Sequence, residues 1–378
     1  MIVKISDNVF SPLGFGSRAN YEALKRGTIG GKYYEGLYGL PEPCFVSIID
    51  DGEIDSRFEA MANGRYSRFE KMMLLSVVDA LRGTDIDVCG EDVVFILSTT
   101  KGNIRMLEEE DECDMERVNL WSSAQVLGDY FGLSKVPIVV SNACISGLSA
   151  QVLAMDYLKV GLCKYAVVVG VEELSKFIIS GFQSFKALSA KQCKPFDENR
   201  DGLNLGEAAA TVIYERIDDN EKVQGKVALL GGGICNDANH ISAPSREGEG
   251  LLRAWNDARG MWDISQLAFI NAHGTATRYN DDMESTAIYR AGLEGVAVNS
   301  LKGYFGHTLG AAGVLETIMS SYALEEGVAL ATAGYEKFGV VHSIHVNKTL
   351  QKVEGNKFAK MISGFGGSNA AALFEYIK

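Results

Sequence analysis

The sequence predicts an α/β fold made of two similar halves, and three observations support it. The chain has 378 residues, which exceeds the usual size of one compact core. Short apolar runs rich in β-branched residues alternate with longer helix-like segments, as is typical of buried, largely parallel strands layered with helices. A segment in the middle of the chain also resembles one near its C-terminal end, which indicates a duplicated unit.

Three short apolar runs are the clearest predicted strands. They read VVFIL at 93–97, VPIVV at 136–140 and AVVV at 166–169. Pro137 is compatible with a strand because it lies among the first residues of its run. Longer segments of helical character separate these runs, so we expect them to lie in one layered half.

The internal repeat divides the chain. Residues 205–215, LGEAAATVIYE, resemble residues 367–376, GSNAAALFEY, and each segment is typical of a closing strand after a glycine turn. The apolar segments 93–97 and 267–270 form a second, weaker match. Between the halves, the charged stretch RIDDNEKV suits an exposed connection. We therefore predict halves comprising residues 1–222 and 223–378.

Composition excludes several classes of protein. A net charge of −13 argues against simple attraction to nucleic acid. No apolar stretch has the length of a membrane-spanning helix, and the N-terminal residues lack a secretion-signal pattern. The seven cysteines are scattered without metal-ligand spacing, so neither a disulfide framework nor a zinc site is expected. We expect a cytoplasmic protein without a cofactor.

Cys144 lies where a predicted strand meets a predicted helix. In VVSNACISG, residues 139–147, small residues lead from the apolar run into the amphipathic stretch 148–160. A sharp turn there would place the sulfur at a helix N-terminus, where backbone N–H groups favour a nucleophilic thiolate. A single cysteine is more often a small buried apolar residue, so this local pattern leaves both interpretations open.

Two histidines lie in glycine-containing segments at predicted strand ends. His273 occurs in FINAHGTAT, residues 269–277, and His307 occurs in NSLKGYFGHTLGAAG, residues 299–313. One such histidine is more often a hydrogen-bonded structural residue. Two of them, together with a poised cysteine, favour a reactive site.

Five motifs together resemble the β-ketoacyl synthase family. Besides the segments around Cys144, His273 and His307, they are KPFD at 194–197, continued by RDG at 200–202, and GFGGSN at 364–369. They occur in the family's order and span most of the chain. The resemblance implies a thiolase-like fold, layered α/β/α/β/α, in a homodimer whose active site lies close to the interface.

The resemblance also implies a chemistry. Cys144 would carry an acyl group as a thioester, and a malonyl unit on acyl carrier protein would lose carbon dioxide and attack it. His273 and His307, as neutral N–H donors, suit the developing negative charge. Backbone N–H groups of Cys144 and Phe365 would hold the thioester oxyanion. This set of one cysteine and two histidines favours elongation over thiolysis or coenzyme A-primed initiation.

Supporting roles follow from the same resemblance. Lys302 would pair with Glu316, although a solvated surface lysine is the alternative. Thr275 and Thr277 match threonines that bind the pantetheine arm, although such hydroxyls also cap turns. Phe365 matches a gating aromatic residue whose neighbouring glycines allow it to rotate.

Four oxygen-bearing residues match positions where some relatives hold a structural cation. They are Asn271, Glu284, Glu316 and Asn369. Oxygen ligands suit a hard or alkali cation. The alternative, slightly preferred, is an ion-pair cluster that includes Lys302. Neither interpretation implies metal catalysis.

Docking of an acidic carrier protein would require a basic surface on this acidic chain. Arg65, Arg68 and Lys71, with Arg200 nearby, are the candidates, although an ordinary solvated helix face explains the first three equally well. Three departures from the family pattern affect the acyl pocket and docking: Ile145 follows the nucleophile, Arg278 and Tyr279 replace a usual turn, and GEAA at 206–209 lacks the family's common second glycine.

The expected function is decarboxylative Claisen condensation, giving a β-ketoacyl-carrier product in fatty acid, polyene or polyketide-like synthesis. The expected partners are acyl carrier protein, acyl and malonyl thioesters, and a second subunit, either identical or different. Two alternatives are a non-catalytic subunit resembling a chain length factor and an acyltransferase that loads Cys144 without condensation.

Overall fold

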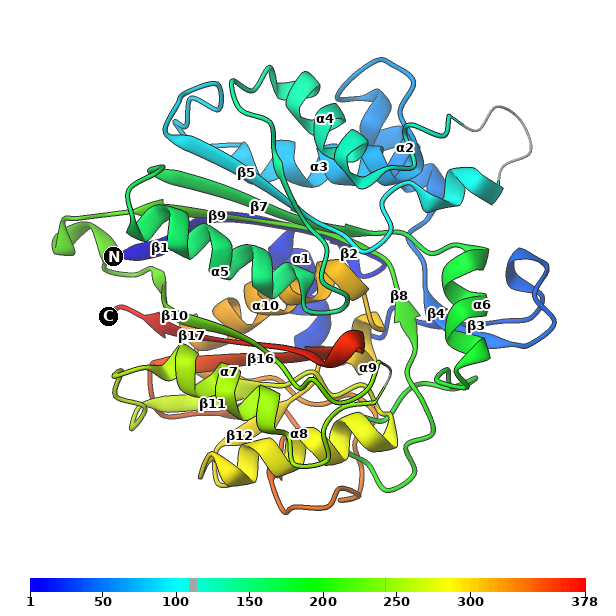
Figure 1. Ribbon diagram of the computed structural model, residues 1–378, viewed down its shortest axis with the longest axis vertical. Coiled ribbons are helices and arrows are strands. Elements are labelled where there is room, and N and C mark those ends of the chain that lie inside the picture. The colour runs from blue at the N-terminus through cyan, green and yellow to red at the C-terminus, as the bar shows by residue number, and fades with distance from the viewer. Residues whose placement is uncertain (109–113, 242) are drawn as a thin grey trace.

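The computed structural model describes residues 1–108, 114–241 and 243–378, and its main strands form one 12-stranded sheet whose two halves stack as separate layers, called the first and the second sheet below (Figure 1). The two halves join where β1 (Ile2–Ser11) pairs with β10 (Val227–Asn236), with Val3 opposite Ala228, and a two-stranded and a three-stranded sheet lie apart from them. The predicted boundary near residue 222 lies in the segment between β9 and β10.

Each sheet has the same strand order. The first runs β6-β5-β7-β9-β1 and the second runs β12-β11-β16-β17-β10, with the short β14 added beyond β12. The remaining bounds are β5 (Val93–Ser98), β6 (Ile138–Val140), β7 (Tyr165–Glu172), β9 (Ala208–Arg216), β11 (Leu267–Asn271), β12 (Ala297–Asn299), β14 (His345–Val346), β16 (Lys357–Gly364) and β17 (Ser368–Tyr376). The predicted repeat of two similar halves is therefore confirmed.

The prediction of largely parallel strands is wrong in part. β5 pairs in parallel with β6 and β7, but β9 is antiparallel to both β7 and β1. The second half repeats this arrangement, because β16 turns directly into β17 through the short η5 (Phe365–Gly367). A connection that short permits only an antiparallel pair.

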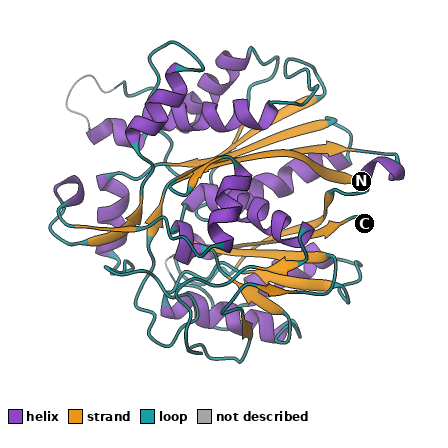
Figure 2. Cartoon of the chain, turned by 180° about the vertical axis from the view of Figure 1, so that it is seen from behind, coloured by secondary structure: helices purple, strands orange, loops and turns teal. Residues whose placement is uncertain are grey.

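Helices lie outside both sheets and between them (Figures 1 and 2). α5 (Ser146–Lys159) and α10 (Ala312–Glu325) contact strands of both halves. Almost every residue of α10 is buried, as expected of a helix enclosed on all sides. α3 (Arg68–Leu81) covers the first sheet and α7 (Glu249–Arg259) the second. The predicted five layers, α/β/α/β/α, are confirmed.

Glycines allow the two central helices to meet at their N-terminal ends. A Cβ atom on Gly147 would lie 2.7 Å from the Gly310 carbonyl oxygen, and one on Gly313 would lie 2.3 Å from the Leu148 nitrogen. Neither contact leaves room for a side chain. This close approach brings the segment before α5 next to the segment before α10.

The other elements are short or peripheral. The helices are α1 (Ser17–Lys25), α2 (Asp51–Glu59), α4 (Leu120–Phe131), α6 (Lys176–Ser184), α8 (Arg278–Arg290), α9 (Lys302–Phe305), η1 (Leu37–Gly39), η2 (Ile104–Glu108), η3 (Asn220–Val223) and η4 (Leu309–Ala311). The strands are β2 (Gly14–Phe15), β3 (Lys32–Tyr34), β4 (Cys44–Ser47), β8 (Leu205–Gly206), β13 (Val328–Ala329) and β15 (Gln351–Lys352). Within the described ranges, no helix has the length and apolar character needed to cross a bilayer.

Candidate active site

Cys144 lies in a tight turn between β6 and α5, as predicted. Ala143 adopts a left-handed conformation with φ of 44°, which is uncommon for a residue with a side chain. The turn is closed by hydrogen bonds: the Asn142 N–H donates to Ser146 Oγ at 2.7 Å, and Ser146 Oγ donates to the Ala143 carbonyl at 2.6 Å. The sulfur is thereby held directly before the first turn of α5.

The prediction of a resting thiolate is not met. Cys144 is only 7% exposed, and burial raises the pKa of its thiol to about 11, although the Lys302 charge and the Phe365 backbone N–H act in the opposite direction. Loss of hydration therefore outweighs the favourable electrostatics. The free thiol is neutral at rest.

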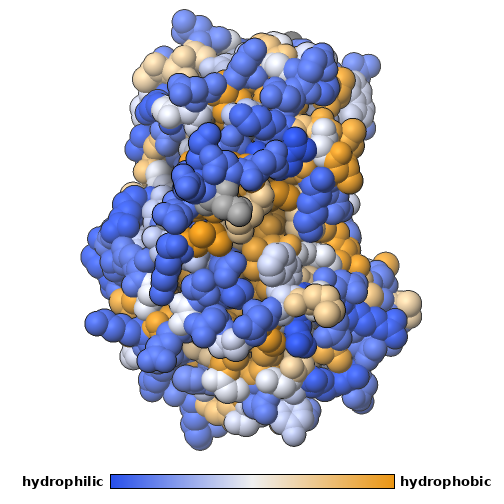
Figure 3. Space-filling model, turned by 90° about the vertical axis from the view of Figure 1, so that its left-hand side faces the viewer, coloured by the Kyte–Doolittle hydropathy of each residue, from blue (hydrophilic) through white to orange (hydrophobic). Residues whose placement is uncertain are grey.

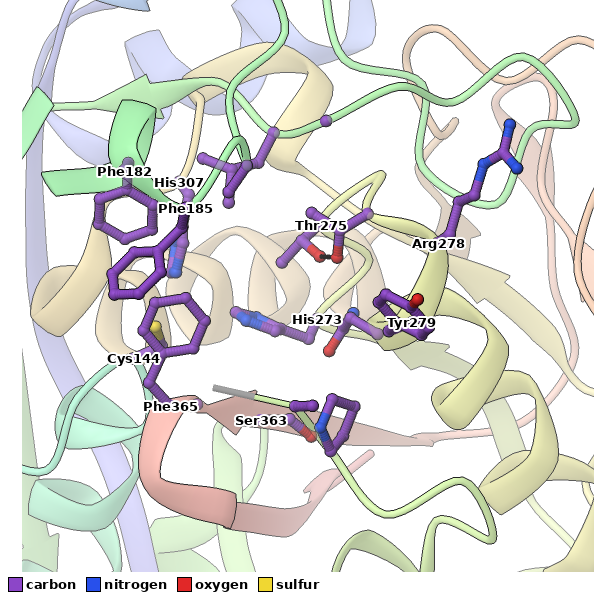
Figure 4. A pocket seen from close by; sticks show the side chains of 18 of the residues that line it. Cys144, Phe182, Phe185, His273, Thr275, Arg278, Tyr279, His307, Ser363 and Phe365 are labelled. Atoms are coloured by element: carbon purple, nitrogen blue, oxygen red, sulfur yellow. Dashed lines mark hydrogen bonds between the residues drawn. The ribbon is translucent and has the colours of Figure 1, made fainter. Parts of the chain in front are cut away.

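His273 and His307 converge on the sulfur (Figure 4). One side-chain ligand atom from each of Cys144, His273 and His307 lies within 4.8 Å of the others. The two imidazoles meet edge to face, with centroids 4.9 Å apart. Burial lowers the pKa of both histidines well below 6.5. Both rings are therefore neutral.

The backbone fixes the tautomer of His307. The Leu309 N–H donates to His307 Nδ1 at 3.3 Å, so Nδ1 carries a lone pair and the proton resides on Nε2. Nε2 has no hydrogen-bond partner among the described residues. His307 therefore presents an unused N–H donor in the site.

Lys302 is part of a buried ion cluster. Its side chain is 0% exposed and its Nζ donates to Glu316 Oε1, so it is not a surface lysine. A second lysine, Lys360 on β16, is also 0% exposed and lies 2.8 Å from Glu316 Oε2. Sequence reasoning missed Lys360. Its one signal was a lysine in the interior of an otherwise buried apolar strand.

The four predicted cation ligands are engaged with protein groups, and Asn271 Nδ2 donates to Asn299 Oδ1 at 2.8 Å. Glu284 accepts the backbone N–H groups of His273 and Gly274, at 2.7 and 2.6 Å. Asn369 instead accepts from Ser363 Oγ at 2.7 Å. Glu316 faces the two lysines. The ion-pair alternative fits these contacts better than a bound cation does.

Phe365 lies beside Cys144 at the turn between β16 and β17. Its ring stacks on Phe182 at 5.8 Å and meets Phe185 edge to face at 5.5 Å. A Cβ atom on Gly364 would lie 3.1 Å from the Cys144 backbone nitrogen. Glycine thus allows the Phe365 loop to approach the nucleophile closely. The two phenylalanines of α6 and its C-terminal end were not predicted, because nothing in the local sequence relates them to Cys144.

These side chains line a cavity of about 450 Å³. Cys144, His273 and His307 lie on its wall, as do Thr275 and Thr277. The two threonine hydroxyls are 2.9 Å apart, and Thr277 makes no side-chain cap to α8, which disfavours the capping interpretation. Exposed Lys186 and Arg278 also line the cavity.

The predicted basic surface is largely committed to internal contacts. Arg68 is 12% exposed and pairs with Glu207 at 2.7 Å. Arg200 is 5% exposed and pairs with Asp282 at 2.7 Å. Lys71 pairs with Asp55 at 2.7 Å, and only Arg65 of the four is an exposed residue. Arg68 and Arg200 therefore act inside the fold, because buried cations require paired anions.

Ile145, the residue after the nucleophile, is fully buried in the main hydrophobic core. The same cluster includes buried residues of α5 and α10, so the departure from the family pattern lies within the core.

Two family descriptions match the chain. "Beta-ketoacyl synthase, N-terminal domain" matches residues 40–220, and "Beta-ketoacyl synthase, C-terminal domain" matches residues 227–336. Together they cover most of the sequence.

Curated relatives carry corresponding names. The 3-oxoacyl-acyl-carrier-protein synthase 2 of Vibrio cholerae is 33% identical over 264 residues, or 65% of this chain and 63% of the relative. The protein of the same name from Rhizobium meliloti is 32% identical over 252 residues, or 62% of this chain and 60% of the relative. A putative mitochondrial 3-oxoacyl-acyl-carrier-protein synthase of Schizosaccharomyces pombe is 28% identical over 67% of this chain and 64% of its own length. The chain thus matches less than two thirds of each relative.

Solved structures share the fold. A ketosynthase from Xenorhabdus doucetiae, determined in complex with its chain length factor, superimposes with a TM-score of 0.87 at 23% identity, covering 99% of this chain and 97% of that one. A beta-ketoacyl synthase from Burkholderia phymatum gives a TM-score of 0.85 at 22% identity, covering 100% and 99%. With its thiolase-like fold and both matching domains, the chain belongs to the β-ketoacyl synthase family.

Proposed function

We propose that this chain catalyses decarboxylative condensation of an acyl group on Cys144 with a malonyl unit on acyl carrier protein. One observation carries the proposal: a cysteine and two neutral histidines converge within 4.8 Å on the wall of a cavity. Three such donors also resemble part of a zinc site. The neighbouring backbone N–H donors and paired threonines favour thioester chemistry.

Acyl loading would begin with attack of the Cys144 sulfur on an acyl thioester. A carbon–sulfur bond forms to Cys144, the bond to the donor sulfur breaks, and the thiol proton passes to the departing sulfur. The backbone N–H groups of Cys144 and Phe365 would hold the tetrahedral oxyanion. Proton transfer is required because the pKa of the resting thiol is about 11.

Condensation would follow in the same cavity. The malonyl carbon–carbon bond breaks, carbon dioxide leaves, and the electron pair forms an enolate. Its oxygen would accept N–H bonds from His273 and from His307 Nε2. The enolate carbon then attacks the Cys144 thioester, and the released thiolate takes up one proton. Neutral histidines suit this role, since they stabilise the enolate oxygen without readily protonating the carbanion.

The remaining residues have positioning roles in this scheme. Thr275 and Thr277 would hydrogen-bond the pantetheine arm that enters the cavity. Phe365 would act as the gate, because Gly366 and Gly367, with φ of 82° and 73°, allow the loop to turn. Its contacts with Phe182 and Phe185 would hold the closed position.

The carrier would dock at the cavity rim. Among the described residues, the exposed side chains of Lys186 and Arg278 line the cavity without a salt bridge. Two unpaired cations there suit the phosphate of a pantetheine arm and an acidic carrier surface. This pair replaces Arg68 and Arg200 in the proposed docking surface, while Arg65 and Lys71 stay as a second candidate.

Assembly with a second subunit would use the open edge of the first sheet. β6 is the last strand of its sheet, and its three residues are only partly buried. Val136, two residues before β6, is 73% exposed. Figure 3 shows apolar side chains gathered in a band on the face that bears the termini. An unpaired apolar edge favours pairing with another strand, identical or different. Cytoplasmic location stays a prediction.

A reconstituted reaction separates this function from its alternatives. The protein would be incubated with acyl-carrier and malonyl-carrier, following carbon dioxide release and the mass of the carrier-bound product. Condensation predicts both. A loading acyltransferase would acylate Cys144 without releasing carbon dioxide, and a non-catalytic subunit would do neither; either result would refute the proposal.

A further inference from the structure

Lys360 is a buried cation enclosed by oxygen atoms. It lies in β16, and its side chain is 0% exposed. Its Nζ lies 2.8 Å from Glu316 Oε2, 3.0 Å from the Met361 carbonyl oxygen and 3.5 Å from the carbonyl oxygens of Asn271 and Ala272. An ammonium group removed from water is costly unless oxygen atoms of this kind replace its hydration.

The neighbouring lysine in the same strand shows a different environment. Lys357 pairs with Glu375 on β17, and its side chain retains 9% exposure. This interaction of Lys357 is a single ion pair between neighbouring strands. Lys360, by contrast, contacts three separate segments: the end of β11, its own strand and α10.

The oxygen atoms around Lys360 belong in part to the strand end that bears His273 and to the carboxylate that binds Lys302. Ala272 directly precedes His273. Glu316 also binds Lys302. Burial lowers the pKa of His273 and His307, and the Lys302 charge lowers it further; burial raises the pKa of the Cys144 thiol, and the Lys302 charge opposes that rise. One ammonium group thus connects the strand end that bears His273 with the ion pair that supports the cysteine.

We propose that the Lys360 ammonium serves as a built-in monovalent cation, which positions the β11 end and the Glu316–Lys302 pair for the reaction proposed above. Two features support this role over that of an ordinary ion pair. Most of its contacts are to neutral carbonyl oxygens, as for a coordinated alkali cation. The side-chain Oδ1 of Asn271 is also buried and has no hydrogen-bond partner among the described residues. A residue that already contacts Lys360 therefore carries a second oxygen atom without a partner.

Other charged groups face Lys360 from each packed element. They are Glu316 on α10, Lys302 on α9 and Glu284 on α8. Removing Lys360 leaves Glu316 paired with Lys302 alone and leaves the carbonyl oxygens without a cation. An ammonium ion and a potassium ion have similar size and equal charge, so external potassium is the natural substitute.

The test is to remove the ammonium group and offer a cation in its place. Lys360→Ser opens the space, Lys360→Met fills it with an uncharged chain, and Lys357→Ser is the control in the same strand. Thermal unfolding, Cys144 acylation and malonyl-carrier decarboxylation would each be measured in KCl and in choline chloride at equal ionic strength.

The expected pattern is specific to one variant. For the wild type, Lys357→Ser and Lys360→Met, the melting temperature and the decarboxylation rate of each protein should be the same in KCl as in choline chloride. Lys360→Ser should lose decarboxylation by about tenfold to a hundredfold in choline chloride, retain acylation, and regain both melting temperature and decarboxylation in KCl.

Three results would overturn the inference. They are a wild type that itself requires potassium, a Lys360→Ser variant that is indifferent to potassium, and an unfolded Lys360→Ser variant that potassium does not restore. The melting-temperature response needs no substrate. A wrong proposal about the reaction is therefore distinguishable from a wrong assignment of Lys360.

Discussion

The backbone N–H of Leu309 donates to Nδ1 of His307 at 3.3 Å. This one contact leaves the His307 proton on Nε2. Because burial also lowers the pKa of His307 and His273, each ring enters the reaction as a neutral N–H donor.

Decarboxylation should therefore be insensitive to pH across the range in which an ordinary histidine titrates. Lowered pKa values mean that neither ring gains a proton until the pH falls well below 6.5. Rates of carbon dioxide release from malonyl-carrier between pH 6 and 8 would check this. An acid limb centred near 6.5 would show that a histidine with an ordinary pKa takes part.

His307→Ala should separate loading from condensation. The variant loses the Nε2 donor but keeps the Cys144 turn, so acylation should persist while condensation falls by about a hundredfold or more. Intact mass reports the first and product formation the second. Unchanged turnover would remove the proposed role of His307.

Gly364→Ala should damage the oxyanion site. The added methyl group would lie 3.1 Å from the Cys144 nitrogen and 3.3 Å from Ala143 Cβ, so the Phe365 loop must retreat. We expect the acylation rate to fall by about a hundredfold, measured as the rate of mass gain. Gly366→Ala is the control for backbone strain in the loop. Its φ is 82°, which strains an alanine, but a Cβ there meets nothing within 4 Å. Equal acylation rates in Gly364→Ala and wild type would contradict the assignment.

Charge reversal at the rim should weaken carrier binding. Lys186→Glu and Arg278→Glu should each raise the KM for malonyl-carrier roughly fivefold to tenfold at low salt, and less at high salt. Lys71→Glu provides the comparison. If only Lys71→Glu raises KM, the carrier docks on the surface around α3 and not at the rim.

Glu172 should make the protein less stable as the pH rises. Burial raises the pKa of this carboxyl to about 7, so the folded state holds a proton that the unfolded state has lost. Stability from this group is fully present below the unfolded pKa of 4.5, declines as the pH rises toward the folded pKa of about 7 and then levels off, a loss of about 2 kcal/mol between pH 5.5 and 8. Glu172→Gln should remove that decline. Urea unfolding would give the free energy of unfolding of both proteins at pH 5.5 and 8. An equal decline in wild type and Glu172→Gln would contradict the assignment.

The sequence predicted the parts of the fold and site that have local signals. The repeat at 205–215 and 367–376 corresponds to β9 and β17, which close equivalent sheets. The turn around Cys144 was predictable because small residues join an apolar run to a helix. Both patterns lie within a few neighbouring residues.

The remaining features depend on contacts between distant segments. The Cys144 thiol is neutral because segments from distant parts of the chain bury it and raise its pKa. The ion pair of Arg68 with Glu207 likewise joins residues far apart in the chain. Lys360 gave a local hint, but its oxygen neighbours come from β11 and α10. No single-sequence pattern encodes such contacts.

The most direct test of the central claim is the mass of the Cys144 peptide during one reaction cycle. Wild-type protein exposed to an acyl thioester should gain the acyl mass on the peptide containing Cys144. Malonyl-carrier should then remove it as an extended β-ketoacyl-carrier product, and Cys144→Ala should show neither step. Acylation at another residue, or product formation by Cys144→Ala at the wild-type rate, would contradict the account.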